Sequence, residues 1–206
     1  MLVTLAQSLV LAYTSGISPY ATVALLGLLQ RAHWIAPLPG PLGTLAHPVV
    51  LGVAGVLAVV EFAGTLVPGI AATWDAIHTA VRPPAAALLA VLTAWHSDAS
   101  VVALAGLLGG GLGLATHATK LGVRLAVDAS PEPVTNGAMN VVEWGIIGSL
   151  SYFVWNHPLA ALMAALAILI LTILLVRLVW RVVRRVVTSP FRAREVTSTY
   201  EDVPLP

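Results

Sequence analysis

Long apolar segments separated by glycine, proline and polar residues make up most of this chain and restrict the folds open to it. Seven such segments lie approximately at residues 2–15, 20–36, 48–67, 70–96, 101–127, 134–156 and 158–180. Charged residues are only 9% of the 206, whereas a soluble domain has roughly 25%. With a mean hydropathy of +0.92, the sequence predicts an all-α, polytopic helical membrane protein with six to seven membrane segments.

A repeated order of two dipeptides indicates an internal duplication. In each half a Ser-Pro pair begins one apolar segment and a His-Pro pair begins the next, at Ser18-Pro19, His47-Pro48, Ser130-Pro131 and His157-Pro158. We therefore predict two weakly similar halves, residues 1–82 and 101–187, joined by a linker helix at 83–100. Such repeats are common in transporters, whose sites form between the halves near broken helices.

Proline and glycine also indicate where helices are short or broken. The first two segments are separated by SGISP and are short enough to be half-length or tilted helices. The adjacent Pro83 and Pro84 should kink or divide the fourth segment, because proline lacks the amide donor and clashes with the preceding turn.

Basic residues are concentrated near the C-terminus and predict the orientation of the chain. Six of the ten lie in the last thirty positions, at Arg177, Arg181, Arg184, Arg185, Arg192 and Arg194. We therefore expect an inner-membrane protein with a cytoplasmic C-terminus, and an outside N-terminus if all seven segments cross. The basic stretch RLVWRVVRRVV should meet anionic lipid. Residues 1–187 are predicted to form one transmembrane domain, followed by a disordered cytoplasmic tail at 188–206.

Ionisable side chains inside the apolar segments are the strongest indication of function, since a charge at membrane depth costs a few kcal/mol or more unless it is paired or hydrated. Two stripes carry such side chains at the helical spacing i, i+3, i+7, namely Asp75, His78 and Arg82, and His117, Lys120 and Arg124. The first stripe fits either an interfacial helix with self-paired charges or a polar face that lines a cavity. The second fits either snorkelling to the inner interface or an inward-facing cationic strip that suits an anionic solute.

Two glutamates lie deepest in the apolar segments. Glu61 follows twelve apolar or glycine residues after Pro48, and Glu143 shares a helix face with Asn136 and Asn140. Both carboxylates fit a structural salt bridge that fixes helix packing, or a group that binds a proton or cation during transport. An unpaired glutamate there suits a proton relay, whereas a glutamate that meets Lys120 or Arg124 holds helices together.

The segments SGISPY and DASPEP should each start a new helix with free amide donors. Ser18 and Ser130 are predicted N-caps with proline at the first helical position, and Glu132 complements the second helix dipole. These helix starts are candidate anion sites, and ordinary capping is the alternative interpretation.

Overlapping glycine pairs in GLLGGGLG, Gly106 with Gly110 and Gly109 with Gly113, indicate close helix contact. We expect this contact within one chain, with a homo-oligomer as the alternative.

Several classes of function lack support in the sequence. The chain has no cysteine, which excludes disulfides and thiolate chemistry. No Walker loop, dinucleotide fingerprint, HExxH motif or nucleophile elbow occurs. We therefore predict no cofactor, no metal and no nucleic-acid partner.

Three stretches resemble one known family. SGISPYATVALLGLL, VVEFAGTLVPGIAATWDAIHTAVRPPAAALL and GGGLGLATHATKLGVRLAVDASPEPVTN are similar, in this order, to bacterial membrane proteins called domain of unknown function 4126. The likeness covers roughly residues 5 to 185 and excludes the tail. It implies a small polytopic inner-membrane protein and implies no activity.

Three functions are compatible with these observations. The first is a small transporter or channel for an ion or a small solute, with anionic solutes among the candidates and the ionisable groups at the interface of the two repeats. The second is a non-transporting assembly or lipid-binding protein whose buried charges are structural salt bridges. An intramembrane enzyme that acts on a lipid ranks last, because no catalytic spacing supports it.

Overall fold

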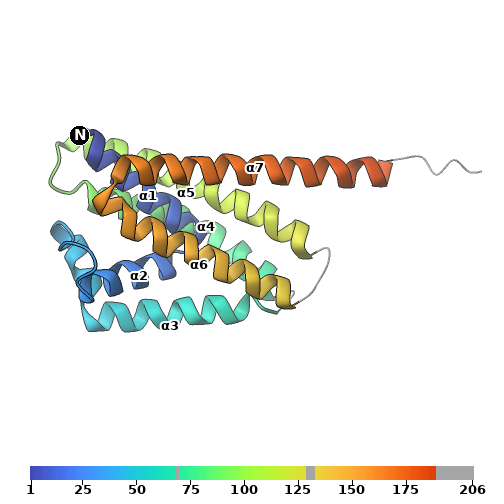
Figure 1. Cartoon of the computed structure of the whole chain (residues 1–206), viewed down its shortest axis with the longest axis horizontal. Coiled ribbons are helices and arrows are strands. Elements are labelled where there is room, and N and C mark those ends of the chain that lie inside the picture. The colour runs from blue at the N-terminus through green and yellow to red at the C-terminus, as the bar shows by residue number, and fades with distance from the viewer. Residues whose placement is uncertain (68–69, 129–132, 189–206) are drawn as a thin grey trace, which may run out of the picture.

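The computed structural model of the protein describes residues 1–67, 70–128 and 133–188, and all regular structure in them is helical (Figure 1). Ser130, Glu132 and the predicted tail after residue 188 lie outside the described residues. The helices in chain order are α1 (Leu2–Ile17), α2 (Pro19–Arg31), the 3-10 helix η1 (Gly40–Ala46), α3 (Pro48–Gly64), α4 (Ile70–Thr93), α5 (Ala99–Asp128), α6 (Pro133–Asn156) and α7 (Pro158–Thr188). The all-α prediction is confirmed.

Three described stretches are long and apolar enough to cross a membrane: Thr73–Thr93, Ala99–Arg124 and Pro158–Leu178. The pair formed by η1 and α3 is bent by 70° and adds a fourth if it counts as one span. The outer surface is apolar too, with Val53, Leu107 and Leu171 exposed by 57%, 77% and 68%. These helices fit a membrane protein, and the count of six to seven crossings stays a prediction.

Helices α1 and α2 form a hairpin that reaches only into the middle of the bundle (Figure 1). They contain 16 and 13 residues, or roughly 24 and 20 Å at 1.5 Å per residue, shorter than the ~30 Å hydrocarbon layer. The chain reverses at Ser18, whose backbone is extended and whose hydroxyl accepts a hydrogen bond from the Ala21 amide at 3.2 Å. The prediction that these segments are half-length, with Ser18 as an N-cap, is confirmed.

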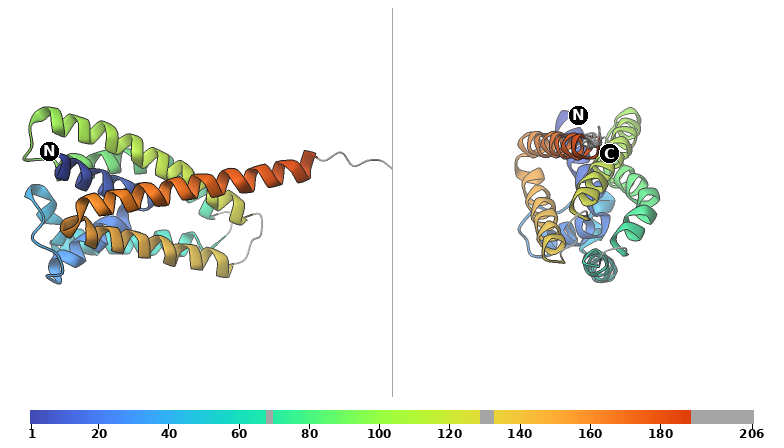
Figure 2. Two further views of the ribbon diagram at one scale, coloured as in Figure 1. Left: turned by 45° about the horizontal axis from the view of Figure 1, so that its top comes forward. Right: turned by 90° about the vertical axis from the view of Figure 1, so that its right-hand side faces the viewer.

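Small residues allow α1, α4 and α5 to pack closely. A Cβ atom added at Gly113 of α5 would lie 2.3 Å from the Cβ of Ala86 in α4, and one added at Gly109 would lie 2.5 Å from that of Ala90. A Cβ atom added at Gly16 of α1 would lie 2.7 Å from the carbonyl oxygen of Gly113. The glycine pairs therefore mediate contact within one chain, as expected. The views in Figure 2 show α1 enclosed by its neighbours.

Of the two predicted effects of Pro83 and Pro84, a kink or a division of the fourth segment, the division does not occur. Helix α4 runs from Ile70 to Thr93 with both prolines inside it. Arg82 is fixed by ion pairs on one side of the prolines and Ala86 packs on α5 on the other, so tertiary contacts hold the helix across the missing amide donors. Residues 83–93 thus continue the helix that carries Asp75, and the proposed division into repeats stays a prediction.

The two ends of the bundle differ. The N-terminus and η1 lie at one end, and the last turns of α7 extend beyond the other helices at the opposite end (Figure 1). Helices α6 and α7 meet at His157 and diverge toward the second end (Figures 1 and 2). This divergence leaves room beside α5, where a cavity is found.

Candidate functional site

Six ionisable side chains from four helices meet inside the bundle, and we refer to them as the charge cluster. They are Glu61 of α3, Asp75 and Arg82 of α4, Lys120 and Arg124 of α5, and Glu143 of α6. The side chains of Asp75 and Arg82 are fully buried, and that of Glu143 is 13% exposed. Three cations face three carboxylates, so the formal charge of the cluster is zero.

Arg82 and Asp75 connect most of the cluster. Nη2 of Arg82 lies 2.6 Å from Oε1 of Glu61 and 2.9 Å from Oδ1 of Asp75. Nε of Arg124 lies 3.0 Å from Oδ2 of Asp75, so this carboxylate bridges two arginines. Because the desolvation of one buried ion costs several kcal/mol, each of these groups depends on its partners to stay ionised.

Arg124 and Asn140 connect the cluster to the end of α3. The guanidinium of Arg124 donates to the Thr65 carbonyl and to Oδ1 of Asn140, both at 3.3 Å. The Asn140 amide in turn donates to the Phe62 carbonyl at 3.2 Å and to the Thr65 hydroxyl at 2.8 Å. One turn earlier, Asn136 is fully buried and neither atom of its amide has a hydrogen-bond partner.

The break between α1 and α2 supplies two further contacts. Lys120 Nζ donates to the carbonyl of Ile17 at 3.1 Å and to Oε2 of Glu143 at 2.6 Å, and it lies 4.0 Å from Glu61. The Ser18 hydroxyl donates to Oε2 of Glu61. The sequence indicated an anion site at this helix start, and the anion found there is the carboxylate of Glu61.

His117 adds no charge to the cluster. Its Nδ1 lies 2.6 Å from Nη1 of Arg82, and since a guanidinium can only donate, Nδ1 accepts and the ring is neutral. Nε2 then carries the proton and donates to the Thr79 hydroxyl at 2.9 Å, which donates to the Asp75 carbonyl. The stripe of His117, Lys120 and Arg124, predicted as a cationic strip, therefore carries two positive charges.

His78 points to a different set of neighbours from Asp75 and Arg82 of the same stripe. Its Nδ1 lies 2.7 Å from the Trp74 carbonyl and its Nε2 lies 3.2 Å from the Tyr20 hydroxyl, and the ring stacks on Trp74. The stripe therefore divides between the charge cluster and an aromatic contact.

The positions of these side chains exclude two of the interpretations that the sequence left open. Lys120 and Arg124 are 7% and 2% exposed, so they do not snorkel to an interface. Asp75 and Arg82 do pair with each other, but both are fully buried and also pair with Arg124 and Glu61 of other helices, so α4 does not present them at an interface. Both stripes and both glutamates face inward.

A cavity of about 340 Å³ adjoins the cluster between α1, α5, α6 and α7. Its lining is mainly apolar, and Lys120 and Glu143 form its charged wall. Tyr13 and the hydroxyls of Thr119 and Thr172 also line it, and none of these three was predicted from the sequence. Thr119 could have been predicted, because it is a polar residue next to Lys120 in a segment otherwise rich in glycine and alanine.

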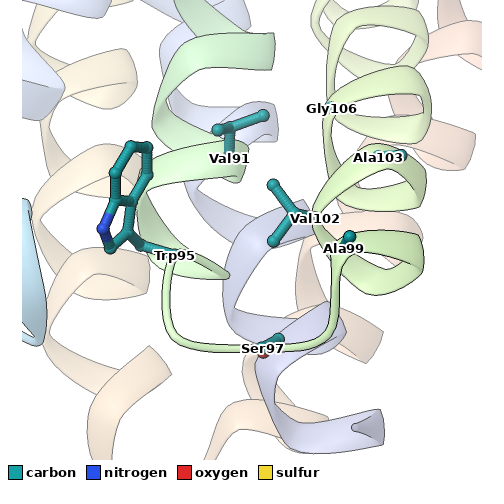
Figure 3. Close-up of a pocket in the computed structure, with 7 residues that line it drawn as sticks. All are labelled: Val91, Trp95, Ser97, Ala99, Val102, Ala103 and Gly106. Atoms are coloured by element: carbon teal, nitrogen blue, oxygen red, sulfur yellow. The ribbon is translucent and has the colours of Figure 1, made fainter.

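A second, more open groove of about 470 Å³ lies where α4 turns into α5 (Figure 3). Val91, Trp95, Ser97, Ala99, Val102, Ala103 and Gly106 line it. None of them is titratable, so this groove offers no acid, base or counter-ion. Among the described residues, no group of three or more His, Cys, Asp or Glu side chains is arranged to hold a metal ion.

Comparison with known proteins gives one result at the level of the family. No curated protein and no solved structure matches the chain. The family described as Domain of unknown function (DUF4126) matches residues 5–203. This match extends beyond the resemblance at residues 5 to 185 and includes most of the tail that we had excluded. The protein therefore belongs to the family DUF4126.

Proposed function

We propose that this protein is a small membrane transporter for an anionic organic solute, and that the Lys120–Glu143 pair is the part of the charge cluster that exchanges. The observation that carries the proposal is that both members of this pair line the cavity. Arg82, Asp75 and Arg124 pair with one another or with Glu61 and do not line it. The cluster thus has a fixed part and a part within reach of a solute.

Charge balance determines how an anion could be admitted. The cluster is neutral, and an added anion would leave one uncompensated charge at low dielectric, which is strongly unfavourable. If Glu143 takes up a proton when the anion arrives, Lys120 is released to pair with the anion and the cluster stays neutral. The proposed transport is therefore electroneutral, one proton with one monoanion.

The groups that face Glu143 are compatible with this exchange. Lys120 of α5 pairs with it, Tyr13 of α1 lines the same cavity, and Glu61 of α3 lies on the far side of Lys120. The residues of α7 that line the cavity are not titratable. A proton that reaches the cavity thus has Glu143 as its carboxylate acceptor.

A dye assay in liposomes tests this proposal. Purified protein is reconstituted into liposomes loaded with the pH-sensitive dye pyranine, and benzenesulfonate is added outside. This anion stays ionised at neutral pH and brings no proton of its own, so a fall in lumenal pH reports protons moved with it. We expect acidification faster than in protein-free liposomes.

Two variants and two matched controls make the assay specific. Glu143→Gln, which is close to isosteric, and Lys120→Met should reduce acidification to the protein-free rate. Asp98→Asn and Arg177→Gln change exposed charges outside the cluster and should keep the wild-type rate. A wild-type protein that is folded in the liposomes and moves no protons would contradict the proposal.

The second candidate is a non-transporting assembly or lipid-binding protein. The buried arrangement of Arg82 and Arg124 with Glu61 and Asp75, two cations with two carboxylates, favours it, since such ion pairs can fix helix packing without any transport. Under this alternative, liposomes show no proton movement while the energetic coupling within the cluster persists. For both candidates we propose an inner-membrane location with a cytoplasmic C-terminus, on the grounds of the basic residues near that end, and no enzymatic activity.

A further inference from the structure

We infer that the cavity beside Lys120 binds one alkyl chain of an amphiphile that has one negative charge in its headgroup, and that this molecule enters from the bilayer. The inference rests on the proposed function and specifies its substrate class. It is based on the lining of the cavity, on the side to which the cavity opens and on the number of cations within it.

The body of the cavity is apolar. Helix α6 contributes Met139, Val142 and Ile146, and α7 contributes Ile168 and Leu169. Such side chains make favourable contacts with an alkyl chain, which has no polar group to be left unpaired there. A fully hydrophilic anion would leave this surface without a partner.

The cavity opens to the outer surface of the bundle. Thr135, Ala138 and Val142 belong to its lining and are also exposed, so they mark its mouth on α6. On α7, which diverges from α6 here, Leu171 and Leu175 are exposed by 68% and 52% (Figure 1). The mouth is therefore surrounded by an apolar surface, and a molecule dissolved in hydrocarbon reaches it more readily than one dissolved in water.

The polar end of the cavity has one cation. Lys120 supplies the ammonium group, while the hydroxyls of Thr116, Thr119 and Thr172 donate their protons to carbonyls of their own helices. Glu143 neutralises this ammonium group, and once Glu143 takes up a proton, as in the proposed function, the ammonium group balances one negative charge on the ligand. The cavity has a volume of about 340 Å³, near the lower limit of small-molecule sites, and this favours one alkyl chain over two.

Two sources supply this chemistry, a free alkyl carboxylate or one chain of an anionic phospholipid. Native mass spectrometry of the detergent-purified protein separates them. Decanoate, decanol and phosphatidylglycerol are added in separate experiments, and bound molecules are counted for each chain. We expect one decanoate per chain, with about tenfold less decanol because decanol cannot form the ion pair. Binding of phosphatidylglycerol in place of decanoate keeps the inferred chemistry and assigns its source to the bilayer.

Variants test whether the molecule occupies this cavity. Lys120→Met should abolish the preference for decanoate over decanol. Ala138→Phe fills the mouth and leaves the ion pair intact, so it should remove binding even if Lys120→Met fails to fold. Ala167→Phe is the matched control, an exposed alanine on α7 outside the lining, and should bind like wild type.

The outcomes separate this inference from the proposed function. Equal binding of decanoate and decanol, or undiminished binding in Ala138→Phe, would overturn the inference, as would a wild-type protein that binds neither anionic ligand. Proton movement with benzenesulfonate would then still support transport. Specific decanoate binding without proton movement would leave the amphiphile site standing and remove the transporter.

Discussion

Arg82 is fully buried in α4, and its charge is balanced by protein groups. Arg82 forms ion pairs with Glu61 and Asp75, and it donates a hydrogen bond to the neutral ring of His117. Removal of a single partner leaves one unpaired charge in a cluster that is otherwise neutral. At the scale of single residues, the sign and number of charges therefore decide which substitutions the fold tolerates.

Glu61→Gln and Arg82→Met should be strongly coupled. Either change alone leaves an unpaired buried charge and should lower the free energy of unfolding by about 3 kcal/mol. The double variant keeps the Asp75–Arg124 and Lys120–Glu143 pairs, so its loss should be smaller than the sum of the two by about 1–3 kcal/mol. Unfolding in detergent, followed by tryptophan fluorescence, measures this coupling. Asp98→Asn combined with Arg82→Met is the control and should be additive; additivity for Glu61 as well would exclude the structural ion pair.

Two asparagines on one face of α6 should respond in opposite ways to leucine. Asn136 is buried without a hydrogen-bond partner, so Asn136→Leu should be neutral or should stabilise the protein by about 1 kcal/mol. Asn140→Leu removes hydrogen bonds to Phe62 and Thr65 and should cost about 2 kcal/mol or more. The same unfolding assay distinguishes them. Equal destabilisation would mean that the Asn136 amide is satisfied in the folded protein.

The residue types at the site were predictable from the sequence, and their pairing was not. Every cluster residue was identified because a charge inside an apolar segment stands out. The partner of each depends on the rotation and depth of four helices, which no local pattern encodes. The neutral state of His117 follows from its distance to Arg82, and the cavity arises from the divergence of α6 and α7.

At the scale of helices, the contact between α4 and α5 depends on individual glycines. Gly109 and Gly113 lie against Ala90 and Ala86, so these two helices approach more closely than larger residues would permit. Gly111 lies in the same run and faces open space.

Gly113→Ala and Gly111→Ala therefore form a matched pair. The methyl group at position 113 would overlap Ala86 and force the helices apart, at a cost of about 1–3 kcal/mol. At position 111 the same change should stabilise the protein by up to about 1 kcal/mol, since alanine is the better helix former. Thermal unfolding in detergent compares them. Similar melting temperatures for both variants would show that α4 and α5 do not pack through Gly113.

Helix boundaries followed closely from the sequence where proline marks a start, as at Pro19, Pro48 and Pro158. The predicted alternative of a division at Pro83 and Pro84 was wrong, because packing on both sides of the prolines keeps α4 continuous. The short length of α1 and α2 was predicted, but their return to the same end of the bundle was not, since length alone does not fix direction.

At the scale of the whole molecule, the N-terminus and the end of α7 lie at opposite ends of the bundle (Figure 1). The α1–α2 hairpin begins and finishes at the same end of the bundle. The N-terminus and the end of α7 can therefore lie at opposite ends even if the chain crosses the membrane fewer than seven times. The prediction that the termini lie on opposite sides of the membrane is thus independent of whether the first two segments cross.

Cysteine labelling tests this arrangement directly, because the sequence has no cysteine of its own. In right-side-out vesicles a membrane-impermeant maleimide should label Thr44→Cys in η1 and should label Arg181→Cys only after permeabilisation. Both positions are exposed, so a difference in labelling reports sidedness. Labelling of both positions in sealed vesicles would contradict the predicted topology.

The enclosure of α1 has a consequence for biogenesis. Ten of its 16 residues are buried, among them Ser8, whose hydroxyl donates to the carbonyl of Ala90 in α4. When α1 emerges from the ribosome, α4 and α5 have not been translated. The α1–α2 hairpin can therefore reach its final position only after α4 and α5 have been made, so its packing is a late step of folding. In that step the hydroxyl of Ser18 forms its hydrogen bond to the carboxylate of Glu61.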